Sequence, residues 1–333
     1  MDTAFPATGF LRHGNLSGVT STSRLPWIAL GVVYVLWGST YLANRFVLPS
    51  VPPLLVGGFR FLVGGVLLAV IVLCVAGRAA FRWTPAQFGT TALSGLLLPA
   101  WGNGMVVVAQ QGVSSGLAAL LIAAVPLWIV LLRALTGDRP RTATIAGVGV
   151  GVVGLAVLVF AGPASGGVQG TTWWGPWLVL LASLGWATGT FATTRLPVPP
   201  NPFALAAVQM LTGGVVLLAV GTVLGERLDV VAVSGAAWIA WAYMSIVVTL
   251  GAFSAYAFAL ASLPVSTVAT YAYVNPVIAV ALGAFVAGER FTALQLVGAA
   301  VVLLAVVLVV SAERPSRKRP SRKCQSGVAA SGA

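Results

Sequence analysis

Arg60 is the one charged side chain that lies well inside an apolar segment of the chain, the run over residues 54–76. It lies about six residues, or roughly 9 Å along a helix, from the nearer end of that run. A charge at this depth is costly in lipid and is a functional hypothesis by default. A guanidinium suits planar anions such as a carboxylate or a phosphate. Two structural interpretations stay open: snorkelling to the membrane surface, and capping of carbonyls in a neighbouring helix.

Polar and aromatic residues interrupt the other apolar runs and could line a binding cavity. Tyr271, Tyr273 and Asn275 crowd one and a half turns of a predicted helix beside Pro276, which makes them the strongest candidates after Arg60. Taken singly, each also fits a helix–helix hydrogen bond or an interfacial aromatic residue. The candidate substrate-binding residues are Arg60, Trp37, Ser39, Asn103, Trp186, Gln209, Tyr271, Tyr273 and Asn275.

Two prolines occupy corresponding places in two long apolar runs, Pro126 within residues 116–132 and Pro276 within residues 268–284. A proline removes a backbone donor and frees the carbonyl one turn earlier, here near Ile122 and Ala272. Paired interruptions of this kind are the best sequence indication of a transporter site. We therefore expect both prolines to act as kink or gating positions. A kink that only improves packing remains the alternative.

Two short motifs imitate catalytic or nucleotide-binding signatures. Gly149, Gly151 and Gly154 fit G-x-G-x-x-G, but they lie inside an apolar run without the preceding strand that a dinucleotide site needs. Close helix packing through small residues explains them better. Ser114 fits G-x-S-x-G, but it opens a predicted membrane helix and the single histidine, His13, is far away. We expect Ser114 to be a helix N-cap.

The remaining chemistry-bearing residues predict no catalytic, metal or cofactor site. One histidine and two distant cysteines, Cys74 and Cys324, make no ligand cluster. All six acidic residues lie in loops, tails or edges of apolar runs, so no carboxylate relay crosses the membrane interior. Glu289 is a rim acid that could still titrate.

The composition indicates what must position these residues. Hydrophobic residues make up 59% of the 333-residue chain, charged residues only 7%, and the mean hydropathy is +0.99. A soluble domain has about 25% charged residues, so the fold class is an all-α integral membrane protein, with continuous runs of about 20 residues rather than the alternating pattern of a barrel. The predicted spans are residues 27–46, 54–76, 86–108, 115–135, 143–161, 175–194, 202–224, 235–259, 265–287 and 293–311.

The chain repeats itself after about 150 residues. Trp37 and Trp186 lie in the first span of each half, Gly64-Gly65 returns as Gly213-Gly214, and Pro126 returns as Pro276. Each copy has five spans, and an odd number turns the second copy upside down in the membrane. This is the inverted-repeat architecture of secondary transporters, which bind substrate between the repeats.

This organisation predicts five segments. They are an N-terminal tail (1–26), the first five-helix repeat (27–161), a linker (162–174), the second five-helix repeat (175–311) and a basic disordered tail (312–333). The basic, Pro/Ser-rich tail is expected to touch anionic lipid rather than nucleic acid, because no aromatic or nucleic-acid-binding motif accompanies its charge.

The Lys/Arg distribution predicts the orientation. With the N-terminus in the cytoplasm, 14 of the 18 basic residues fall on the inside and three on the outside, and Arg60 lies within a span. The positive-inside rule then places both termini in the cytoplasm. The inside set is Arg12, Arg24, Arg78, Arg82, Arg133, Arg139, Arg141, Arg195 and six residues of the tail; the outside set is Arg45, Arg227 and Arg290.

Three stretches resemble the EamA-domain proteins of the drug/metabolite transporter superfamily. "WGSTYLANRFVLPSVPPLLVGGFRF" (37–61) is similar to the first two helices of that domain, and "GVSSGLAALLIAAVPLWIVLL" (112–132) to its fourth. "LPVSTVATYAYVNPVIAVALGAFVAGERFTALQLVG" (263–298) is similar to the end of the second copy. The residues of these stretches are most similar to those of the YedA-like and PecM-like exporters.

This resemblance implies ten helices as two inverted EamA repeats, a central cavity and export of a small metabolite or drug from a bacterial cell across the inner membrane. It fixes no substrate. The sequence departs from the family pattern at Asp138, where the family usually has Glu, at Trp186-Ala187 in place of Trp-Gly, and at Gln209, which stands where the first copy has Arg60. The two halves are therefore not equivalent at the site.

The function expected is a secondary transporter that exports a small organic solute, such as an amino-acid-like compound, by alternating access. A channel or scramblase-like protein is the alternative, and a membrane enzyme is the less favoured one because catalytic groups are missing. The expected partners are a small-molecule substrate and the lipid bilayer, without nucleic acid, and a homodimer is left open.

The topology can be tested with reporter fusions. A reporter fused after residue 165 should lie outside, and one fused after residue 325 should lie inside, because an odd number of spans separates these positions. Activities of a periplasmic and a cytoplasmic reporter at both sites measure this. A cytoplasmic signal at residue 165 would overturn the inverted repeat.

Overall fold

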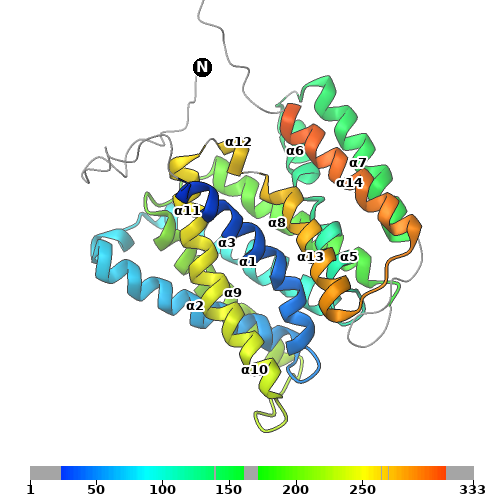
Figure 1. Cartoon of the computed structure of the whole chain (residues 1–333). Helices are drawn as coiled ribbons and strands as arrows, with labels where there is room; N and C mark the ends of the chain where they lie inside the picture. The colour runs from blue at the N-terminus through cyan, green and yellow to red at the C-terminus, as the bar shows by residue number, and fades with distance from the viewer. Residues whose placement is uncertain (1–23, 139, 161–171, 264, 269, 313–333) are drawn as a thin grey trace, which may run out of the picture.

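The computed structural model describes residues 24–312 except residues 139, 161–171, 264 and 269, and this described part is helical without strands. Figure 1 shows the helices gathered into one bundle. In the first half they are α1 (Leu25–Val47), α2 (Pro53–Ala76), η1 (Arg78–Phe81), α3 (Pro85–Gly95), η2 (Leu96–Asn103), α4 (Gly104–Ala109), α5 (Ser115–Ile122), α6 (Val125–Leu135) and α7 (Thr142–Phe160). In the second half they are α8 (Gly175–Arg195), α9 (Pro202–Val223), α10 (Gly235–Ala242), η3 (Tyr243–Ala252), α11 (Phe253–Ser262), α12 (Val265–Val268), α13 (Tyr271–Ala287) and α14 (Ala293–Ala312).

Several helices begin at side chains that accept hydrogen bonds from the first turn. Thr84 and Gln87 form a reciprocal capping box at α3, and Asn201 accepts from two backbone N–H groups of α9. The Oγ atom of Ser114 accepts from the N–H of Leu117 at 3.4 Å, which confirms the predicted N-cap of α5. Such caps satisfy donors that a helix start leaves unpaired.

Eight helical stretches of the described residues are long and apolar enough to cross a membrane. Three of them combine consecutive segments: α3 to α4 over Pro85–Ala109, α5 and α6 over Ser115–Leu135, and α10 to α11 over Gly235–Tyr256. The predicted spans 175–194 and 265–287 correspond to α8 and α12–α13, which are not among the eight. Helix α13 is apolar but has 17 residues, so it is shorter than each of the eight stretches.

The third span of each half contains a π-helical segment. In the first half it is η2, which includes Pro99, and in the second half it is η3. A π-helical segment inserts an extra residue per turn and is frequent at functional sites. The two segments start 147 positions apart in a chain that repeats after about 150 residues, at Leu96 and Tyr243. The duplication therefore extends to this irregular backbone.

The main helix pairs are retained when the two halves are exchanged. Helices α2 and α9 pack together, and so do α7 and α14, which lie side by side along one edge of the bundle in Figure 1. In the first half α1 packs on α13 of the second half, and in the second half α8 packs on α6 of the first. Helices of both halves thus form one core.

Large apolar side chains cover the outer surface of the bundle. A soluble protein would bury such residues, whereas a bilayer solvates them. The surface therefore has the character of a lipid-facing one. Examples are Val66, Val70 and Ile71 of α2, Val152 and Val153 of α7, and Leu294, Val297 and Leu304 of α14.

Glycines allow α2 and α9 to approach closely. A Cβ atom added at Gly214 would lie 2.9 Å from the backbone nitrogen of Leu62 and 3.0 Å from the backbone oxygen of Gly58. These are backbone atoms and cannot rotate away. Small residues that bring helix backbones together are the usual means of association in a membrane, where hydrophobic driving force is absent. This crossing positions Arg60, which lies on α2 between Gly58 and Leu62.

Gly214→Ala should destabilise the protein, because the added methyl group forces α2 and α9 apart. Overpacking of this kind costs about 1–3 kcal/mol. Gly149→Ala is the matched control, since a Cβ there meets no atom within 4 Å. Thermal melting of both purified variants in the same detergent measures the difference. Equal melting temperatures for the two variants would contradict the close crossing.

Candidate functional site

Arg60 is buried inside the bundle. Its side chain is 7% exposed, so it does not snorkel to the surface. One of its Nη atoms lies 3.9 Å from the sulfur of Met244, and its guanidinium lies over the Phe61 ring at 5.3 Å. The Nε atom is buried and has no hydrogen-bond partner. Within the described part of the chain, Arg60 makes no ion pair.

Hydroxyl groups from α1 and η3 lie around this guanidinium. Tyr41 of α1 and Tyr243 of η3 are the side chains in electrostatic contact with Arg60. Tyr243 also shares a hydrogen bond of 2.7 Å with Ser39. Arg60, Ser39 and Tyr243 therefore connect α1, α2 and η3 in one polar site, which we call the Arg60 site.

An aromatic group lies one turn away along α1. The Trp37 ring is 5.0 Å from the Tyr271 ring, edge to face, and 5.3 Å from the Tyr256 ring. The Tyr256 and Tyr271 rings are 5.9 Å apart. These three rings join α1, α11 and α13. A further hydrogen bond between Tyr34 and Thr270 holds the start of α13 to α1.

Helix α13, which carries Tyr273 and Asn275, packs against both α1 and α5. A Cβ atom at Gly38 would lie 3.2 Å from the backbone oxygen of Asn275, so α1 and α13 are in close contact there. The Oδ1 atom of Asn275 is buried without a hydrogen-bond partner. Tyr273 packs against the apolar core that contains Leu117 and Leu121. The predicted crowding of Tyr271, Tyr273 and Asn275 thus divides between an aromatic group, a packed core and an unpaired amide.

The other candidates form a second group between α8, η2 and α9. Gln209 donates a hydrogen bond of 2.7 Å to Ser94, and Trp186 packs on Gly102. The amide of Asn103 donates to the carbonyl of Leu98 at 3.4 Å, within the π-helical turn. Gln209 corresponds by the repeat to Arg60, and Ser94 corresponds to Tyr243. The amide in the second half has a strong partner, whereas the guanidinium in the first half has a weak one.

The paired prolines lie in different local structures. Pro126 is in the first turn of α6, directly after a break at Ala123 and Ala124 that separates α5 from α6. Pro276 lies inside α13, and the turn before α13 precedes it by six residues, at Thr270. A proline is well tolerated in a first turn but costs a hydrogen bond in a helix interior.

Two polar networks were not predicted. The side chain of Asn44 donates to Gln110 at 2.7 Å, and Gln110 donates to the carbonyl of Tyr41 at 2.9 Å. Glu289 is buried and accepts hydrogen bonds from the N–H and Oγ of Ser115 and from the N–H of Gly116, at 2.8, 2.8 and 3.1 Å. The partners are far apart in sequence, so spacing gives no signal for them. Among the described residues, no group of three His, Cys, Asp or Glu side chains gathers as metal ligands.

Comparison with known proteins finds transporters that are similar to most of this chain. The model of the EamA-like transporter family matches residues 25–160 and 173–311. The uncharacterized inner membrane transporter YedA of Escherichia coli K12 is 36% identical over 279 residues, which cover 83% of this chain and 88% of YedA. A probable terminal-alkyne amino-acid exporter of Streptantibioticus cattleyicolor is 29% identical over 84% of this chain and 91% of that protein. A probable amino-acid metabolite efflux pump of Salmonella typhimurium is 25% identical over 82% and 90%.

A solved crystal structure has the same overall fold. It superposes with a TM-score of 0.59 over 86% of this chain and 98% of that chain, with 19% sequence identity. The fold is thus similar although the two sequences have diverged widely.

Replacing each proline by alanine tests whether the interruptions serve transport. Pro126→Ala should restore a backbone donor at the break between α5 and α6, and Pro276→Ala should do so inside α13. We expect near-normal expression of both variants and impaired transport in proteoliposomes. Pro85→Ala is the control, because Pro85 is exposed in the first turn of α3. Unchanged transport in both test variants would assign the prolines to packing alone.

Proposed function

The chain belongs to the EamA-like transporter family, and on this premise we propose that it exports a small metabolite that carries a carboxylate, as an amino acid does. The chain is a multi-pass membrane transporter rather than an enzyme. The proposal assigns the carboxylate of the solute to Arg60.

The observation that carries this assignment is a buried guanidinium that has no anionic partner among the residues the structure describes. Removing a charged group from water costs several kcal/mol unless it is paired and hydrogen-bonded. Arg60 has a sulfur atom at 3.9 Å, an aromatic ring and an unpaired Nε atom. A bound carboxylate would supply two charge-assisted hydrogen bonds in the planar geometry that a guanidinium prefers. An arginine used only to cap a neighbouring helix would have carbonyl partners, and the described structure gives Arg60 none.

The difference between the halves supports a ligand role for Arg60. Gln209 occupies the corresponding place and is satisfied by Ser94 at 2.7 Å. A position that only joins two helices is served by a neutral amide, at a lower desolvation cost than a guanidinium. The charge in the first half therefore suits a requirement beyond packing.

Two relatives support the substrate class. One is named as a probable exporter of a terminal-alkyne amino acid, and another as a probable efflux pump for amino-acid metabolites. An amino acid carries a carboxylate, which is the group that the proposal assigns to Arg60. The aromatic group of Trp37, Tyr256 and Tyr271 next to the Arg60 site would face the ammonium or the side chain of such a solute, since aromatic faces attract cations.

The proposed architecture is a ten-helix transporter of two inverted five-helix repeats, residues 27–161 and 175–311. In this proposal α8 is the sixth span and α12–α13 the ninth, and together with the eight apolar stretches they make ten. Both termini lie in the cytoplasm. The exchange-symmetric packing of α1 on α13 and of α8 on α6 is consistent with this arrangement. Alternating access then moves the solute between the two sides of the bacterial inner membrane.

Arg60→Gln and Arg60→Lys test the anion role. Three probes share one scaffold: propargylglycine, the same compound without its amino group, and the same compound without its carboxylate. Losing a charge-assisted hydrogen bond costs about 1.5–3 kcal/mol, so Arg60→Gln should raise the Kd of the two carboxylate probes roughly ten- to a hundredfold. Arg60→Lys should weaken binding partly, because it keeps the charge and loses the planar fork.

Melting of the same purified variants separates binding from folding. Removal of an unpaired buried charge should leave the melting temperature of Arg60→Gln unchanged or higher. Arg227→Gln, at an exposed loop arginine, is the matched control. Wild-type affinity of Arg60→Gln for propargylglycine, or a lowered melting temperature with intact affinity, would refute the proposal.

A further inference from the structure

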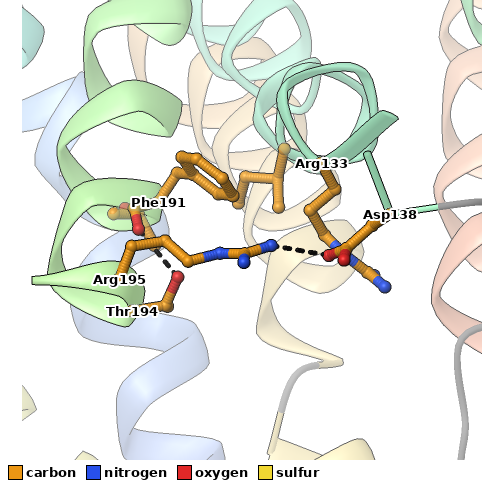
Figure 2. Close-up of a pocket in the computed structure, with 7 residues that line it drawn as sticks. Arg133, Asp138, Phe191, Thr194 and Arg195 are labelled. Atoms are coloured by element: carbon orange, nitrogen blue, oxygen red, sulfur yellow. Dashed lines mark hydrogen bonds and ion pairs between the residues drawn. The ribbon is translucent and has the colours of Figure 1, made fainter. Parts of the chain in front are cut away.

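A polar cavity lies between α6 and α8, and Arg60 is not among its lining residues. Its volume is about 530 Å³, which is in the range of small-molecule sites. Figure 2 shows Arg195 reaching from the end of α8 across this space to Asp138, which follows α6. The lining residues are Ile129, Arg133, Asp138, Thr190, Phe191, Thr194 and Arg195.

The charges of this cavity are not balanced. Asp138 Oδ2 accepts a hydrogen bond of 2.7 Å from Arg195 and one of 3.3 Å from Arg133. Among the residues that line the cavity, two guanidinium groups contact one carboxylate, so this lining is more positive than negative. The three side chains are 37–46% exposed, so a solute can reach them. The guanidinium of Arg195 also lies over the Phe191 ring, 5.2 Å from the ring centroid.

The corresponding pair in the other half is closed. Arg45 and Glu289 stand 150 and 151 positions from Arg195 and Asp138, and they approach to 3.9 Å. The Glu289 carboxylate is buried, however, and it already accepts three hydrogen bonds from Ser115 and Gly116. Of the two pairs, the one between α6 and α8 is open to a ligand.

We propose that the cavity between α6 and α8 is a separate binding site for zwitterionic solutes that carry a carboxylate and an ammonium group, and that solutes occupy it before they reach Arg60. The inference rests on the proposed function and on the proposed topology, which places this cavity on the cytoplasmic side. The carboxylate of the solute binds the guanidinium groups of Arg195 and Arg133, and its ammonium binds Asp138. Thr190 and Thr194 supply hydroxyls, and Phe191 and Ile129 contact its apolar part.

Protection of an introduced cysteine tests this site directly. The test protein is the full chain with Thr194→Cys in a background of Cys74→Ala and Cys324→Ala, purified in lipid nanodiscs. The rate of modification by a charged maleimide is measured with and without propargylglycine. At a probe concentration of twice its Kd, site occupancy should lower the rate about threefold. The probe without the amino group should protect less, and the probe without the carboxylate should not protect.

Two variants of the cavity give the charge specificity. Arg195→Gln should abolish protection by both carboxylate probes. Asp138→Asn should selectively weaken protection by propargylglycine and preserve protection by the probe without the amino group. Each variant is compared with its own unprotected rate, so a change in cysteine reactivity does not affect the result. Arg227→Gln is the control and should retain full protection.

Arg60→Gln in the same cysteine background separates this inference from the proposed function. In this variant propargylglycine should still protect the cysteine at position 194, although binding at the Arg60 site is lost. Loss of protection in Arg60→Gln would assign the effect to the Arg60 site and overturn a separate cavity site. Absence of protection in a protein whose transport of propargylglycine depends on Arg60 would also overturn it, and would leave the proposed function intact.

Discussion

The rest of the site depends on one constraint, a guanidinium that is buried among membrane helices without a carboxylate. Arg60 can occupy this place because α2 crosses α9 through glycines, and because α1 and η3 bring Ser39, Tyr41 and Tyr243 beside it. Hydroxyls lessen the desolvation cost of a charge but do not neutralise it. An anion bound beside Arg60 would remove this energetic deficit, so the same feature that is unfavourable for folding would favour a ligand.

Duplication supplied two similar halves, and single substitutions made them different. At the second-helix position the first half has Arg60 and the second has Gln209, which bonds to Ser94. At the edge of the fourth helix, Glu289 caps α5 in the interior, whereas the shorter Asp138 joins two exposed arginines. The main helix pairs nevertheless retain the exchange symmetry, with α1 on α13 and α8 on α6. The two halves therefore differ in their polar chemistry although their main helix pairs correspond.

Local features of the sequence predicted the helical class, the N-cap at Ser114 and the position of Arg60 inside an apolar segment, because hydropathy and capping act over a few residues. The family resemblance was also confirmed. The surroundings of Arg60 could not be predicted, since Met244 comes from 184 positions away. The same holds for Glu289, whose partner Ser115 is 174 positions away. The helix break before Pro126 and the uninterrupted helix around Pro276 also differ although the sequences correspond, because tertiary contacts decide how each freed carbonyl is satisfied.

The two ion pairs also differ in what it costs to separate them. An exposed pair such as Arg195–Asp138 contributes about 0–1 kcal/mol, because water replaces the partner readily. Separation at Glu289 additionally strips the first turn of α5 of its acceptor, and each buried donor left unpaired costs about 1–3 kcal/mol. Separation of α6 from α8 at this pair therefore breaks an exposed contact, whereas separation of α1 from α13 at Glu289 also breaks buried hydrogen bonds.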